Sequence, residues 1–181
     1  MEYEAYYDND EVVWLTDDEI DAAARHGMEM RAVSLARGHK DKKGYGHRPP
    51  SKEVALKTQA LAAVVEAACF KALGMPIKLT HEVYNVPDLP FNIQARLIGV
   101  AHYGLRVYPN DSPEWKVMGI VIPKGKERGW PYRIPGWYSA KDAMSNQKWI
   151  IAPYGGPPLW AVPQKMLHPL KDLRKLMARE A

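Results

Sequence analysis

Residues 51–76 read SKEVALKTQALAAVVEAACFKALGMP, and this stretch decides the fold. Ser51 can cap a helix at its start. Gly74 and Pro76 end the helix, because glycine adopts the left-handed conformation that follows a helix and proline cannot continue one. Over residues 61–73 nearly every position is apolar. A helix that is apolar all round lies in the middle of a domain, so we expect a buried central helix here.

A first helix is expected upstream of this stretch. Thr16 and Glu19 have the spacing of a capping box, in which both side chains accept hydrogen bonds from backbone N–H groups at a helix start. The apolar residues that follow recur at helical spacing: Ile20, Ala24, Met28, Ala32 and Leu35. The pattern predicts a helix from about Asp17 to Arg37 that ends at Gly38.

A basic loop, punctuated by glycines, follows the first predicted helix over residues 37–48. Such a loop can follow the phosphates of a nucleic acid while Tyr45 stacks on a base. The candidate nucleic-acid-binding residues are Lys40, Lys42, Lys43 and Arg48. A flexible, solvated connector is the alternative interpretation of the same composition.

From residue 77 onward the chain consists of short β-like runs broken by Pro, Gly, Asn and Asp. The predicted strands are Ile77–Tyr84, Phe91–Ile98, Leu105–Tyr108, Trp115–Ile122, Arg133–Trp137 and Leu159–Val162. A brief helix is expected over 139–144, and a leucine stripe predicts an amphipathic closing helix over 167–177. Helices first and strands afterwards favour an α+β fold, in which a central mixed, largely antiparallel sheet packs on the buried helix.

Composition is consistent with one domain over residues 1–181, divided into an N-terminal helix with the basic loop (1–50), a core (51–165) and a C-terminal helix (166–181). The chain is 46% hydrophobic with a net charge of +4, and Cys69 is its only cysteine, which excludes an internal disulfide. Its acidic start does not resemble a signal peptide, and no apolar run approaches the roughly 20 residues of a membrane span. We therefore expect a cytoplasmic protein with no membrane partner.

Glu66 is the most informative single residue. Its neighbours three and four positions away on the predicted helix are all apolar: Ala62, Ala63, Cys69 and Phe70. A carboxylate in such surroundings is either desolvated, at a cost of several kcal/mol, or held by a cation, a metal or hydrogen-bond donors. Partnered carboxylates of this kind gather at functional sites. The alternatives are a solvent-exposed edge and a structural pair with an arginine.

A second feature is the segment 87–97, which alternates from Phe91 onward between apolar and polar residues. Gln94 and Arg96 therefore project from the same face of one predicted strand. Asp88 lies just upstream, where a short turn can bring it alongside them. The alternative is an edge strand with a solvated polar face.

Taken in chain order, these features resemble the PD-(D/E)XK nuclease superfamily, and more narrowly a group of small phage-borne proteins related to that fold. The matching segments are the capped first helix, Glu66, Asp88, Ile93-Gln94-Ala95-Arg96, Leu105-Arg106-Val107-Tyr108-Pro109-Asn110-Asp111, Pro135-Gly136-Trp137 and Leu159-Trp160-Ala161-Val162-Pro163-Gln164. The resemblance covers most of the chain through short motifs and implies a restriction-endonuclease-like core.

The resemblance also implies a role for each matching residue. Asp88 would be the principal ligand of Mg²⁺ or Mn²⁺, cations that favour oxygen donors, and Glu66 would add a ligand or orient a metal-bound water. Gln94 would coordinate through its carbonyl oxygen, and Arg96 stands where the superfamily usually has lysine. The implied reaction is phosphodiester hydrolysis. The implied partner is nucleic acid, with DNA favoured over RNA, in the cytoplasm of a bacterial host if the chain is phage-encoded.

Two departures from the superfamily pattern keep other functions open. Gln94 replaces the usual carboxylate, which removes one negative charge from the metal site. Arg96, as an arginine, stays charged and cannot transfer protons near neutrality, although it can clamp a phosphate. One alternative is therefore a nucleic-acid-binding module without catalysis. Another is a phage–host interaction protein that uses its aromatic surface or closing helix, and a homodimer is common among small proteins of this kind.

Overall fold

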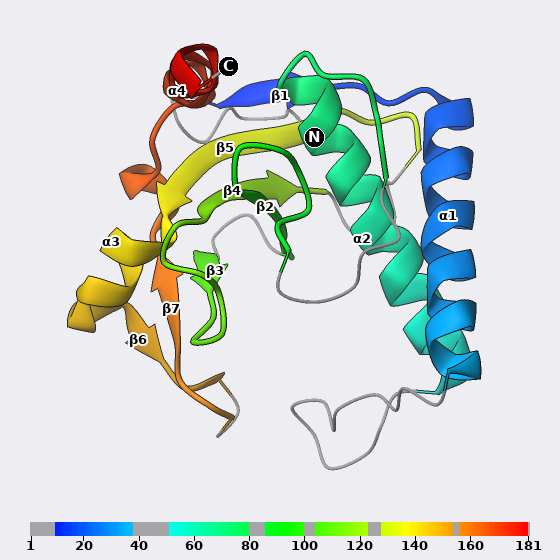
Figure 1. Cartoon of the computed structure of the whole chain (residues 1–181), viewed down its shortest axis with the longest axis horizontal. Coiled ribbons are helices and arrows are strands. Elements are labelled where there is room, and N and C mark those ends of the chain that lie inside the picture. Colours follow the sequence, from blue (N-terminus) through cyan, green and yellow to red (C-terminus); the bar gives the residue numbers. More distant parts are fainter. Residues whose placement is uncertain are drawn as a thin grey trace.

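The computed structural model of the chain describes residues 10–37, 51–79, 86–99, 104–122, 128–153 and 156–180. Its helices are α1 (Asp17–Ala36), α2 (Lys52–Ala72), α3 (Ala140–Ser145) and α4 (Leu170–Glu180), with short 3₁₀ turns at Gln147–Trp149 and Gln164–Met166. Its strands are β1 (Glu11–Val13), β2 (Ile93–Ile98), β3 (Leu105–Val107), β4 (Lys116–Val121), β5 (Tyr132–Ser139), β6 (Ile150–Ile151) and β7 (Leu159–Val162) (Figure 1). The predicted α+β class is confirmed.

Both long helices begin as their caps predict. The Thr16 hydroxyl accepts from the Glu19 N–H at 3.2 Å, and the Glu19 carboxylate accepts from the Thr16 N–H at 2.7 Å. At α2, the Ser51 hydroxyl accepts from the Val54 N–H at 3.3 Å. Gly74 follows α2 with φ 71°, the left-handed conformation expected at that position.

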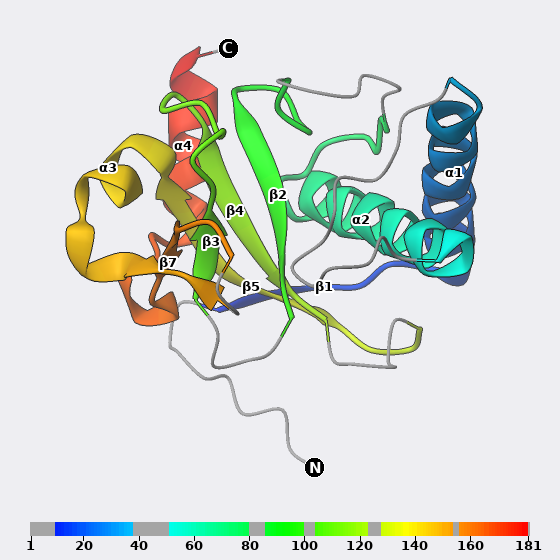
Figure 2. The same ribbon diagram turned by 90° about the horizontal axis from the view of Figure 1, so that it is seen from below.

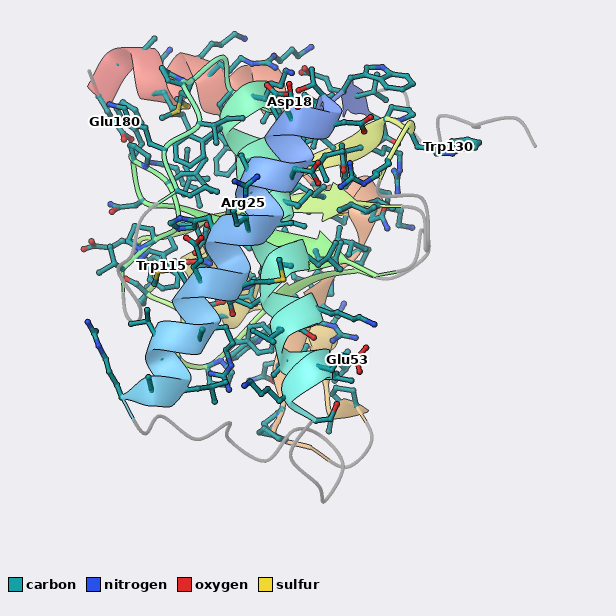
Figure 3. The ribbon with its side chains drawn as sticks, turned by 90° about the vertical axis from the view of Figure 1, so that its right-hand side faces the viewer. Asp18, Arg25, Glu53, Trp115, Trp130 and Glu180 are labelled. Atoms are coloured by element: carbon teal, nitrogen blue, oxygen red, sulfur yellow. The ribbon has the colours of Figure 1, made fainter. Side chains whose placement is uncertain are left out.

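α1 and α2 form an antiparallel pair beside the sheet. Figure 3 shows α1 crossing over α2, with Asp18 and Glu53 near opposite ends of the pair. Lys71 near the end of α2 binds Glu19 at the start of α1, with 2.6 Å between Nζ and Oε2. The helices touch at Gly27, where an added Cβ would lie 2.4 Å from the carbonyl oxygen of Gln59.

Two sheets make up the β portion of the described chain. The four-stranded sheet has the order β1-β5-β4-β2, and the three-stranded sheet has the order β3-β7-β6. The pairs β1–β5 and β4–β5 are antiparallel, β2–β4 is parallel, and the smaller sheet is antiparallel throughout. The expectation of a mixed, largely antiparallel sheet is confirmed.

α2 is the buried central helix that the sequence predicts. It lies between the four-stranded sheet and α1 (Figures 1 and 2), and Ala67, Ala68 and Cys69 have no exposed surface. One apolar core joins α2 to this face of the sheet. A second core fills the opposite face, against β3, β7 and α3. β2 thus stands between two cores, with its outer edge free of a neighbouring strand in the described sheet.

Several predicted boundaries were wrong. Residues 77–79 form no strand, and the rest of the predicted strand Ile77–Tyr84 lies outside the described residues. β2 begins at Ile93 rather than Phe91, because Phe91 and Asn92 have positive φ and form a turn. The closing helix begins at Leu170, directly after Pro169, because proline is tolerated only at a helix start. β1 and β6 are too short to leave a periodic pattern in the sequence.

The leucine stripe of the closing helix covers the protein's own core. Leu170 and Leu173 have no exposed surface and belong to the same core as α2. Arg174 ties α4 to β1, with 2.7 Å between its Nη2 and Oε2 of Glu11. Over the described ranges, none of the helices has the length and apolar character required to traverse a bilayer.

Candidate functional site

A tight turn brings Asp88 back onto β2. Phe91 and Asn92 have φ values of 61° and 58°, and the Leu89 N–H donates to the Ile93 carbonyl at 2.9 Å. The three residues between Leu89 and Ile93, two of them with positive φ, reverse the direction of the chain. The turn explains how a carboxylate six positions upstream lies beside the strand that carries Gln94.

The turn is held in a conformation that L-residues avoid. Positive φ is uncommon outside glycine and especially costly for a bulky side chain such as that of Phe91. Lys116 at the start of β4 secures the turn from the neighbouring strand. Its Nζ donates to the Phe91 carbonyl at 3.0 Å, and its N–H donates to the Asn92 carbonyl at 2.8 Å. Strained backbone of this kind persists only where the surroundings impose it, and it gathers at functional sites.

Asp88 occupies the free edge of β2. Its Oδ2 accepts hydrogen bonds from the Ala95 N–H at 2.9 Å and from Nε2 of Gln94. An edge strand leaves such N–H groups without a strand partner, and here a carboxylate takes one of them. The predicted placement of Asp88 beside Gln94 is confirmed.

Gln94 is buried in this arrangement, with 5% of its surface exposed. Leu97, which was grouped with the apolar face, is 38% exposed instead. The alternative of a solvated polar face on β2 is therefore wrong for Gln94. Strand alternation is retained nearer the start of β2, where Ile93 and Ala95 pack in the core that contains α2.

Glu66 reaches the same site from α2. It has no hydrogen bond or ion pair with any described residue, so the alternative of a structural arginine partner is not observed there. Burial, and after it the negative charge of Asp88, raise the pKa of Glu66 to about 8. A carboxyl group with this pKa is largely protonated at neutral pH and loses its proton when a cation approaches.

The pKa of Asp88 is raised as well. Burial raises its pKa and is the largest influence; the Ala95 N–H, the Arg96 charge and the Gln94 amide oppose it, while the Asp111 charge adds to it. The fully buried Cys69 lies close enough that both carboxylates raise the pKa of its thiol, after burial itself. Glu66 and Asp88 are themselves half-buried, whereas Cys69 is fully buried.

Arg96 completes the group but pairs with a residue to which the sequence analysis gave no role. Its Nη2 lies 2.6 Å from Oδ1 of Asp111, and its guanidinium carbon lies 5.1 Å from the centre of the Tyr108 ring. Asp111 stands in a Tyr-Pro-Asn-Asp turn, where aspartate is explained by turn chemistry alone. Nothing local in the sequence distinguishes it from an ordinary turn residue.

The donor set matches the chemistry of a hard divalent cation. Glu66 and Asp88 offer carboxylate oxygens, and Gln94, which gives its Nε2 to Asp88, retains its carbonyl oxygen. Mg²⁺ and Mn²⁺ favour such ligands and commonly keep several waters. The described residues contain no cluster of three or more His, Cys, Asp or Glu side chains around one point. The protein ligands of such an ion would therefore be two carboxylates, with the amide oxygen as a third donor.

The predicted basic contacts cannot be placed relative to this site. Lys40, Lys42, Lys43 and Arg48 lie outside the described residues. The four candidate catalytic residues, in contrast, all lie within them. Asp88 bonds to Gln94 and to the Ala95 N–H at the free edge of β2, and Arg96 lies on the same strand. Glu66 on α2 lies near enough for the charge of Asp88 to raise its pKa.

A scan against protein-family models, a search of curated proteins and a search of solved structures each returned no match. The relation to the PD-(D/E)XK superfamily stays a prediction from the sequence motifs.

Proposed function

We propose that this protein processes nucleic acid by phosphodiester hydrolysis dependent on Mg²⁺ or Mn²⁺. The observation that carries the proposal is the pair formed by Glu66 and Asp88. Both residues are half-buried, the pKa of each is raised, and Glu66, whose pKa the Asp88 charge raises, has no cationic partner among the described residues. A divalent cation is the group that relieves such a pair.

Each residue of the site has a task in this proposal. Glu66 and Asp88 hold the cation, and the Ala95 N–H and Gln94 amide fix the orientation of Asp88. When bound, the cation lowers the pKa of water and stabilises negative charge on the phosphate. Arg96 donates to phosphate oxygens, a role suited to a group that is always charged and cannot transfer protons near neutrality.

A cleavage assay on DNA and RNA substrates tests the proposal. We expect cleavage that requires Mg²⁺ or Mn²⁺ and that falls by at least about a hundredfold in Asp88→Asn and Glu66→Gln, since each removes a charged ligand. Asp172→Asn is the matched control, because it removes one carboxylate from an exposed pair with Lys175 far along the chain on α4. Equal cleavage by the wild type, the two site variants and the control would exclude this site as the catalytic one.

A second candidate function is a nucleic-acid-binding module without catalysis. Its support is that the two polar residues of β2 already have protein partners, Gln94 with Asp88 and Arg96 with Asp111. In that case the wild-type protein binds oligonucleotides without cutting them, and binding is indifferent to Mg²⁺. Binding would weaken in Arg96→Ala but not in Glu66→Gln.

A further inference from the structure

Asp111 is a buried carboxylate with both oxygens engaged. Its side chain is 5% exposed; Oδ1 lies 2.6 Å from Nη2 of Arg96, and Oδ2 accepts from the Tyr108 N–H at 2.8 Å. A buried carboxylate is tolerated when its charge and its lone pairs are both satisfied. Asp111 meets this condition through one cation and one backbone donor.

The turn that carries Asp111 is itself closed. The Asp111 N–H donates to the Tyr108 carbonyl at 3.0 Å, so these two residues are joined in both directions. Pro109 lies between them and restricts the backbone further. The Arg96 guanidinium therefore meets a carboxylate and an aromatic ring that the turn already holds in place. Stacking on an aromatic face and pairing with a carboxylate are two contacts that fix the plane of a guanidinium.

Arg96 still has unused donors after these contacts. Its Nε is buried and finds no acceptor among the described residues. A guanidinium carries five N–H groups, and a buried one without an acceptor costs free energy until something accepts from it. The positive charge of Arg96 also lowers the pKa of Asp88, so the guanidinium lies close to the candidate cation ligands.

We infer that Asp111, with the Tyr108 ring, is a positioning residue that orients Arg96 so that its remaining donors meet an anionic phosphate group of the substrate. The inference rests on the proposed function, because it places that phosphate beside Glu66 and Asp88. If the Arg96–Asp111 ion pair only joined β2 to the turn between β3 and β4, its loss would lower stability and would not change substrate binding.

Asp111→Asn is the informative variant because it nearly preserves the shape of the side chain. In Asp111 the two carboxylate oxygens accept from Arg96 and from the Tyr108 N–H respectively. Asparagine has a donor NH₂ group in place of one of these oxygens, so one of the two contacts is lost. Asp172→Asn again serves as the control. Arg96→Lys keeps the charge but loses the fork of donors. The NMR signals that disappear in this variant are those of Arg96, and its change in cleavage is the reference for Asp111→Asn.

The orientation of Arg96 is measured first, by NMR of its side-chain Nε–H group, which requires no activity. We expect slow rotation about the Nε–Cζ bond of Arg96 in the wild-type protein. In Asp111→Asn we expect faster rotation, which averages the guanidinium signals. The second readout is cleavage of a labelled DNA oligonucleotide with Mn²⁺. We expect KM to rise on the order of tenfold in Asp111→Asn, with a smaller change in kcat, and the double variant with Arg96→Lys to be no worse than Arg96→Lys alone.

The two claims fail in different ways. An Arg96 signal that is unchanged in Asp111→Asn, or a KM that is unchanged at temperatures where the variant is folded, would overturn the positioning role alone. A wild-type protein that neither binds nor cleaves oligonucleotides would overturn the proposed function and, with it, the phosphate assigned to Arg96.

Discussion

Two regions of this protein bury acidic side chains, and they treat them in opposite ways. At the start of the described chain, Asp10 pairs with Arg133, and their side chains are 2% and 5% exposed. Arg133 also donates to Oε1 of Gln164 at 2.6 Å. At the edge of β2, Glu66 has no such partner and its pKa is raised to about 8. In the first region the buried cation Arg133 stabilises the fold by pairing with Asp10.

This difference indicates where in the protein a ligand would bind. The buried pair gives Asp10 a cationic partner within the chain, although its Oδ1 accepts no hydrogen bond from a described residue. At the edge of β2 the charge of Asp88 raises the pKa of Glu66, and no cation among the described residues pairs with Glu66. The contrast predicts that removing the cation of the first region harms stability, whereas removing a charge from the second improves it.

Arg133→Leu should have the largest effect on stability. It leaves the Asp10 carboxylate buried without its partner, which typically costs about 3–5 kcal/mol of unfolding free energy. Urea denaturation measures the loss. The double variant Asp10→Leu/Arg133→Leu is the control, and it should recover much of the difference because no uncompensated charge remains. Equal stability of Arg133→Leu and the wild type would show that this pair does not hold β1 and β5 together.

Glu66→Gln should stabilise the protein in a pH-dependent manner. The native state keeps the Glu66 proton up to about pH 8, whereas the unfolded chain loses it near pH 4.5. Between these values the native state binds more protons than the unfolded state. The contribution of Glu66 to the free energy of unfolding therefore decreases as pH rises. The variant should match the wild type near pH 4.5 and exceed it by roughly 2–4 kcal/mol at pH 8 without divalent cations. Parallel stability curves from denaturation at several pH values would contradict the raised pKa.

Lys116→Met should have the smallest effect on stability and should test how Asp88 is held. It removes the ammonium that contacts the Phe91 carbonyl and the Glu180 carboxylate, while its aliphatic stem is retained. We expect a loss of about 1 kcal/mol, together with weaker Mn²⁺ binding, because the strained turn then holds Asp88 less firmly. A variant with normal Mn²⁺ affinity would show that the turn needs no support from β4.

The parts of the fold that the sequence predicts are those determined by neighbours in the chain. The caps at Thr16 and Ser51 act over three residues, and the turn that returns Asp88 to Gln94 spans six. Helical periodicity placed Glu66 on a buried helix for the same reason. These features need only local geometry, which residue types and spacing express directly.

The rest depends on contacts between distant segments. Asp111 pairs with Arg96 across fifteen positions, and Asp10 pairs with Arg133 across 123. The parallel pairing of β2 with β4 decides which edge of β2 remains free for Asp88. None of these partners is distinguishable in the sequence from an ordinary turn or surface residue. The candidate site residues could therefore be named from the sequence, whereas Asp111, the partner of Arg96, could not.

Calorimetric titration with Mn²⁺ at about pH 7, in two buffers of different ionisation enthalpy, tests the central claim most directly. Ligands must lose their protons to bind a metal, and the pKa of Glu66 lies above this pH. We predict binding that releases close to one proton per ion in the wild type and in Asp172→Asn. In Glu66→Gln, binding should be at least about tenfold weaker and should release almost no protons. The absence of Mn²⁺ binding, or equal affinity and proton release in Glu66→Gln, would contradict the claim that Glu66 and Asp88 form a cation site.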